Sequence, residues 1–133
     1  MVQRITSGSP WEDIVGYCRA VKVGDIIEVA GTTSMDGEKV IGEGNVYEQA
    51  MFIFSKIETV LRQLDANLHD VVRTRMFVVN IDDWEIIGKA HGEFFKHIKP
   101  VATMVEIKRL IDPRLLIEIE VTAIKHIGNN FKP

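Results

Sequence analysis

The stretch LLIEIEVTAI, residues 115–124, alternates strictly between two kinds of side chain. One set, which is apolar, comprises Ile117, Ile119, Val121 and Ala123, and the other comprises Leu116, Glu118, Glu120 and Thr122. Successive side chains of a strand point to opposite faces of its sheet. The pattern therefore predicts a strand with one buried face and one face that carries two carboxylates.

Four further segments have the composition of strands. The segments are Tyr17–Val23, Ile26–Thr32, Val71–Asn80 and Val101–Ile107. The first two flank Gly24-Asp25, a two-residue signal for a hairpin turn, so they are expected to pair antiparallel. In the last, Ala102, Met104 and Glu106 are expected on the face opposite Val101, Thr103, Val105 and Ile107.

Two segments have the period of a helix instead. Asn45 is a candidate N-cap for a helix over about Val46–Ala66, in which apolar residues recur at spacings of three and four. A second helix is expected after Asp82-Asp83, which we interpret as residues of its N-terminus. Its apolar side would carry Trp84, Ile87, His91, Phe94 and Phe95.

The element order predicts an α+β fold, a mixed sheet with two helices on one face. The other face is then uncovered, although it is expected to carry Ala102, Met104 and Leu116 beside the carboxylates. We infer a symmetric homo-oligomer in which this face packs against copies of itself, with polar groups at clefts between subunits.

Composition restricts the function classes. The 133 residues, 46% hydrophobic and 26% charged, fit one domain spanning residues 1–133. The net charge of −3 disfavours nucleic acid as a partner. Cys18 is the only cysteine, which excludes an intrachain disulfide. No signal-peptide core or membrane-length apolar run is found, so a cytoplasmic protein without a membrane partner is expected.

Common cofactor and metal motifs are absent from the sequence. Gly42-x-Gly44 lacks the third glycine of a dinucleotide fingerprint. The four histidines, which are His69, His91, His97 and His126, do not have metal-ligand spacing. We therefore expect no metal and no organic cofactor.

Several polar residues have both a structural and a functional interpretation. His91 lies on an apolar stripe, as a hydrogen-bonded core histidine or a general acid or base would. Glu118 and Glu120 share a strand face, either as solvated or paired residues or as a two-carboxylate site. Arg73 and Arg75 also share a face and would pair with glutamates or bind an anionic ligand.

Four stretches resemble the RidA family, also called YjgF-like and formerly L-PSP endoribonuclease-like. GYCRAVKVGDIIEVAGTT resembles the family's PYSQAVKVGNLVFVSGQ, and VVRTRMFVVNIDDW resembles VVKTTVFLTDMNDF. FFKHIKPVATMVEI resembles FFGEHRPARSTVEV, and LLIEIEVTAI resembles VLVEIEAIA. Because all four occur in order at compatible spacing, the chain is identified as a member of this family.

The resemblance implies a chorismate-mutase-like α+β fold, assembled as a homotrimer with small-molecule clefts between subunits. Family enzymes hydrolyse reactive enamines and imines such as 2-aminoacrylate without a metal or cofactor. Their key arginine, in the PARS stretch, holds the substrate carboxylate through a bidentate pair.

Ala102 stands at the position of that arginine, and this departure puts the usual deaminase activity in doubt. Ala30 similarly replaces a serine, and Gly88 replaces an asparagine. The catalytic candidates that remain are Glu118, which could orient a water, and Tyr17. The candidate ligand-binding positions are Arg19, Ala30, Gly31, Arg75, Gly88, His91, Ala102 and Met104.

Two functional readings follow. In the first, the trimer binds a neutral or less acidic metabolite and does not carry out the standard reaction. In the second, it is a cofactor-independent imine or enamine deaminase in which another arginine takes over the anchor. Arg19, two residues from Tyr17 and on the same strand side, and Arg75 are the candidates for that anchor.

Overall fold

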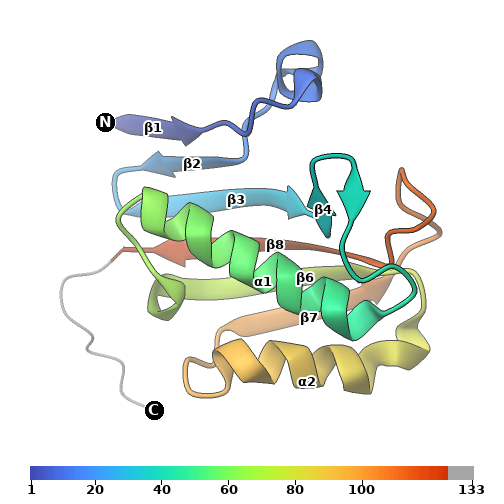
Figure 1. Cartoon of the computed structure of the whole chain (residues 1–133). Helices are drawn as coiled ribbons and strands as arrows, with labels where there is room; N and C mark the ends of the chain where they lie inside the picture. Colours follow the sequence, from blue (N-terminus) through green and yellow to red (C-terminus); the bar gives the residue numbers. More distant parts are fainter. Residues whose placement is uncertain (126–133) are drawn as a thin grey trace.

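Six strands form one mixed sheet in the computed structural model, which describes residues 1–125 (Figure 1). In spatial order they are β1 (Val2–Ile5), β2 (Ala20–Val23), β3 (Ile26–Thr32), β8 (Ile117–Ile124), β6 (Val71–Val78) and β7 (Val101–Glu106). β6 and β7 pair parallel, and the other neighbours pair antiparallel. A separate hairpin of β4 (Met35–Asp36) and β5 (Lys39–Val40) follows β3.

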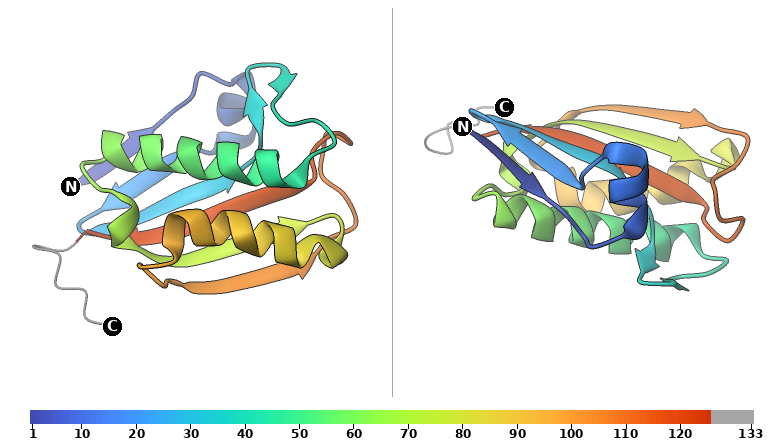
Figure 2. Two further views of the ribbon diagram at one scale, coloured as in Figure 1. Left: turned by 60° about the horizontal axis from the view of Figure 1, so that its bottom comes forward. Right: turned by 90° about the horizontal axis from the view of Figure 1, so that it is seen from above.

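Two helices, α1 (Val46–Gln63) and α2 (Trp84–Phe95), cover the same side of the sheet (Figure 2). The predicted α+β fold with two helices on one face is thus confirmed. Residues 1–125 also contain three single turns: the π-helical η1 (Glu12–Gly16) and the 3₁₀-helical η2 (Leu68–Asp70) and η3 (Ile81–Asp83). The uncovered side of the sheet is called the open face below.

The core lies between the sheet and the helices. The apolar set of β8, predicted to be buried, is at most 1% exposed. It packs in one cluster with the α1 stripe, whose central members Ile53, Phe54, Ile57 and Leu61 are fully buried. Glu118 and Glu120 lie between the buried positions and are partly exposed, as the alternation predicted.

Some predicted bounds differ from the structure. β1 was not predicted, and β2 begins only at Ala20, so Tyr17 belongs to the segment before the strand. Asp83 stands at the N-cap of α2 without a side-chain cap hydrogen bond, and it is the Asn80 side chain that caps the preceding turn η3. Trp84, expected on the apolar side of α2, is 57% exposed.

The predicted facing of β7 is wrong. In the parallel pairing with β6, Ala102 is in register with Thr74 and Met104 with Met76, and residues in register share a face. Thr74 and Met76 are buried beneath the helices, and Met104 packs against the same core. Ala102 and Met104 therefore lie on the helix side, whereas Glu118 lies on the open face.

Gln49 of α1 joins three separate backbone segments. Its side-chain amide nitrogen donates to the carbonyl of Gly42 at 3.1 Å and to that of Arg114 at 3.0 Å. Its side-chain oxygen accepts from the Leu116 amide at 2.9 Å. Gln49 is fully buried, so these bonds hold the loop before α1 and the segment leading into β8 against the helix.

We predict that Gln49→Met lowers the free energy of unfolding by about 3 kcal/mol, because three backbone groups lose their partners at about 1 kcal/mol each. Urea denaturation followed by circular dichroism measures the change. Gln63→Met, at the end of the same helix and more exposed, is the matched control. Equal stability of the two variants would contradict the role of Gln49.

Candidate functional site

A row of charged side chains runs across the open face. Arg75 of β6 is in register with Glu120 of β8, and its Nη1 lies 3.5 Å from Glu120 Oε1. Both side chains are more than a third exposed, so the pair contributes little to stability. This geometry agrees with the interpretation that Arg75 pairs with a glutamate, and Glu120 is that partner.

Glu118, the next residue of β8 on this face, lies over a bulge in β3. The register between β3 and β8 shifts between Val29 and Thr32, which brings Gly31 under the Glu118 side chain. A Cβ built on Gly31 would lie 2.8 Å from Glu118 Oε2 and 2.9 Å from its Cδ. Glycine at this position is therefore what lets the carboxylate lie against the backbone.

Arg19 lies beside the same bulge in β3. Its Nη1 donates to the Gly31 carbonyl at 3.1 Å, and its guanidinium carbon is 5.5 Å from the centre of the Tyr17 ring. The predicted shared direction of Arg19 and Tyr17 agrees with this contact. The Arg19 side chain is 18% exposed. Arg19 thus binds the backbone of the same glycine that lies under the Glu118 side chain, and Tyr17 lies against Arg19.

Glu12, in η1, was missed by sequence reasoning. It is 5% exposed and accepts hydrogen bonds from the amide and the hydroxyl of Ser7. Its Oε2 lies 3.9 Å from Arg19 Nε. The spacing of Ser7, Glu12 and Arg19 matches neither the helix nor the strand period, so no periodic signal could have found this contact.

Burial raises the pKa of the Glu118 carboxyl above its ordinary value. The positive charge of Arg19 offsets part of this effect, and the negative charge of Glu120 adds to it. Within residues 1–125, no side chain or backbone group forms a hydrogen bond or ion pair with the Glu118 carboxylate. A half-buried carboxylate without a partner can bind a donor or accept a proton.

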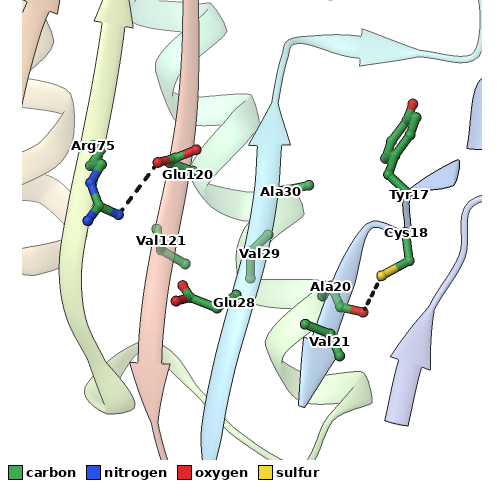
Figure 3. A pocket seen from close by; sticks show the side chains of 10 residues that line it. All are labelled: Tyr17, Cys18, Ala20, Val21, Glu28, Val29, Ala30, Arg75, Glu120 and Val121. Carbon is green, nitrogen blue, oxygen red and sulfur yellow. Dashed lines mark hydrogen bonds and ion pairs between the residues drawn. The ribbon is translucent and has the colours of Figure 1, made fainter. Parts of the chain in front are cut away.

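A hollow of about 450 Å³ opens on the same face of the sheet, and the neighbouring Glu120 lines it rather than Glu118 (Figure 3). Its lining residues are Tyr17, Cys18, Ala20, Val21, Glu28, Val29, Ala30, Arg75, Glu120 and Val121. Arg75 and Glu120 point toward each other at one side of it. Tyr17, Ala30 and Arg75, three of the candidate positions, thus line one hollow of the open face.

His91 lies away from these residues, within the helix layer. Its Nε2 is 2.9 Å from the hydroxyl oxygen of Thr74, on the helix side of β6. Its ring lies 4.8 Å from that of Phe95 and 5.7 Å from that of Phe54, centre to centre. This is the geometry of the core histidine, and burial lowers the pKa of its ring.

The candidate positions thus fall into two groups on opposite sides of one sheet. Tyr17, Arg19, Ala30, Gly31, Arg75 and Glu118 lie on the open face or at its border. Ala102, Met104, Gly88 and His91 belong to the helix side, and a Cβ on Gly88 would meet open space. Within one chain these two groups do not form one cavity.

The described part of the chain offers no cluster of three or more histidine, cysteine or acidic side chains able to hold a metal ion. His126, one of the four histidines considered above, lies outside the described residues. None of the helices in residues 1–125 has the length and apolar character needed to cross a membrane.

Comparison with known proteins places this arrangement in a family. Residues 8–125 match the family model described as Endoribonuclease L-PSP. The uncharacterized protein SCO2049 of Streptomyces coelicolor is 38% identical over 124 residues, which cover 93% of this chain and 92% of that protein. RutC family protein PYRAB12510 of Pyrococcus abyssi is 34% identical, over 82% of this chain and 86% of that protein.

A solved structure points to the same family. Rv2704 of Mycobacterium tuberculosis, described as a member of the YjgF/YER057c/UK114 family, matches with a TM-score of 0.84 and 41% identity. The match covers 94% of this chain and all of that one. The chain belongs to the RidA (YjgF-like) family. The resemblance noted from four sequence stretches is therefore confirmed, and the family match covers nearly the whole chain.

We predict that Glu118→Gln raises the free energy of unfolding at pH 7. A carboxyl whose pKa is higher in the folded state binds its proton more tightly there, so the folded state loses stability as pH rises above the ordinary value of 4.5. The gain should therefore shrink toward pH 4. Urea denaturation at both pH values tests this, with Glu120→Gln as control. Lower stability of Glu118→Gln at pH 7 would contradict it.

The lowered pKa of His91 predicts the opposite trend. The unfolded state takes up the proton first, so the stability contribution is complete above the ordinary value of 6.5 and is lost as pH falls below it. His91→Gln keeps a partner for Thr74 and should flatten the curve of unfolding free energy between pH 7 and 5, by at most about 1.4 kcal/mol per pH unit. Identical slopes in both proteins would refute the assignment.

Proposed function

We propose that this RidA-family protein binds a small metabolite at the Glu118 carboxylate, in a cleft between copies of the chain arranged as a homotrimer. We propose further that the usual hydrolysis of 2-aminoacrylate is weak or absent. Ala102 carries the proposal, because the resemblance puts the substrate-holding arginine at that position and an alanine side chain cannot bind a carboxylate.

The binding energy that is lost without the arginine is large enough to support this proposal. A bidentate contact between an arginine and a carboxylate in a cleft contributes about 2 to 5 kcal/mol. Its loss corresponds to roughly 30- to 4,000-fold weaker binding of an anionic substrate. Arg75 is already paired with Glu120, so it does not simply replace the missing group.

Two observations support assembly from several copies. Apolar side chains stay exposed on the open face, among them Val23, Ile26, Val101 and Val105, each at least 41% exposed. Such a surface is typical of a face that packs against another protein surface. In addition, Ala102 and Glu118 lie on opposite sides of the sheet, so only a second copy can bring both into one cleft.

We predict that wild-type protein releases ammonia and 2-keto acid from 2-aminoacrylate no faster than buffer alone. Ala102→Arg should restore release at least about tenfold, because Ala102 is exposed and the new guanidinium gives the carboxylate its anchor. The substrate is generated in situ, and ammonia and keto acid are measured together. Ala102→Met controls for side-chain size, and the double variant with Glu118→Gln should lose the gain.

A second candidate function is a deaminase that uses Arg19 as anchor. Its support is the position of Arg19, whose Nη1 donates to the carbonyl of Gly31, the glycine under the Glu118 side chain. Rapid ammonia release by the wild-type protein, abolished in Arg19→Gln, would establish this function and exclude the first.

A further inference from the structure

We propose that Glu12 neutralises Arg19 and leaves Glu118 as the unmatched charge of the site, so that the ligand presents an ammonium group to Glu118 rather than a carboxylate. The inference rests on the proposed binding at Glu118 and names the chemical class of the ligand. It assigns to Glu12, which is buried and does not line the hollow, the role of a positioning residue.

Both guanidinium groups that flank Glu118 already have acidic neighbours. Arg19 has Glu12 at 3.9 Å and also donates to a backbone carbonyl. Arg75 has Glu120 at 3.5 Å. Neither arginine brings an excess positive charge that would attract a carboxylate, because each is accompanied by a negative charge at close range.

A third cation close to Arg19, Lys56 of α1, also has an acidic neighbour. Its ammonium group donates to the Met35 carbonyl at 2.7 Å. Burial and the charge of Arg19 lower its pKa, whereas the nearby Asp36 raises it. Asp36 is thus the acidic neighbour of Lys56, and Lys56 does not act as the counter-charge of Glu118.

The direct neighbours of Glu118 on the sheet are uncharged. On β6 its register partner is Phe77, and on the other side the β3 bulge presents Gly31. A carboxylate bordered by an aromatic ring and by backbone is partly stripped of water without gaining an ion pair. The group that best offsets this cost is a ligand cation that can also donate hydrogen bonds.

Glu12 stays beside Arg19 because two hydrogen bonds from Ser7 hold its carboxylate. The neighbouring Asp13 lies in the same turn but is exposed. Glu12→Gln and Asp13→Asn therefore remove the same charge at adjacent positions, and only the first removes the counter-charge of Arg19. Comparison of these two variants therefore separates the loss of the counter-charge of Arg19 from a general change in net charge.

The test uses full-length ¹⁵N-labelled protein and three probes of similar size: propylammonium, propionate and the uncharged propanamide. Titration at pH 7 is followed through the Gly31 amide signal. Propylammonium should bind the wild-type protein most tightly, and Glu118→Gln should remove that preference. Glu12→Gln should shift the affinity ratio toward propionate by about fivefold, the effect of roughly 1 kcal/mol of Coulomb energy. Asp13→Asn should leave the ratio unchanged.

Each of the other possible results of this titration contradicts one particular part of the proposal. Tighter binding of propionate than of propylammonium by the wild-type protein would overturn the ligand class and leave binding at Glu118 intact. Equal ratios in Glu12→Gln and Asp13→Asn would overturn the role of Glu12. If Glu12→Gln does not fold, the comparison of wild type with Glu118→Gln still decides the ligand class. No response of Gly31 to any probe would overturn both this inference and the proposed function.

Discussion

The alternation along β8 is the constraint on which the rest of the structure depends. β8 lies between β3 and β6, so each of its side chains has a strand on both sides. Its apolar set closes the core against α1, and the intervening residues place Glu118 and Glu120 on the open face. A shift of pairing by one residue would exchange the two sets, burying both carboxylates and exposing the core. The same register thus fixes both the packing of the core and the position of the candidate site.

Sequence reasoning succeeded where a period was long and had one meaning. α1 and β8 each bury one stripe or face, and in both cases the pattern predicted the buried residues. It failed at β7, an edge strand with apolar or small residues on both faces, because alternation alone does not say which face is buried. The parallel register with β6 settles that question, and it is a long-range property of the sheet.

Part of the site also depends on contacts that have no periodic signature. Gly31 was named from the resemblance, yet its physical role, space for the Glu118 side chain, follows only from the bulge in β3. Glu12 reaches Arg19 through a π-helical turn, and Gln49 joins loops distant in sequence. Such polar contacts are formed by one particular backbone geometry, so they could not be predicted from residue types alone.

The separation of Ala102 from Glu118 also bears on the kind of assembly that the proposed function requires. A cleft with both residues must join the helix side of β7 in one copy to the open face of another. Because Ala102 and Glu118 lie on opposite sides of one sheet, they do not belong to one self-complementary surface, so the proposed contact is heterologous, between different surfaces of the two copies. Heterologous contacts form rings when the rotation between neighbours closes, and a trimer is the smallest ring of this kind. The proposed trimer and the proposed site therefore rest on the same geometric requirement.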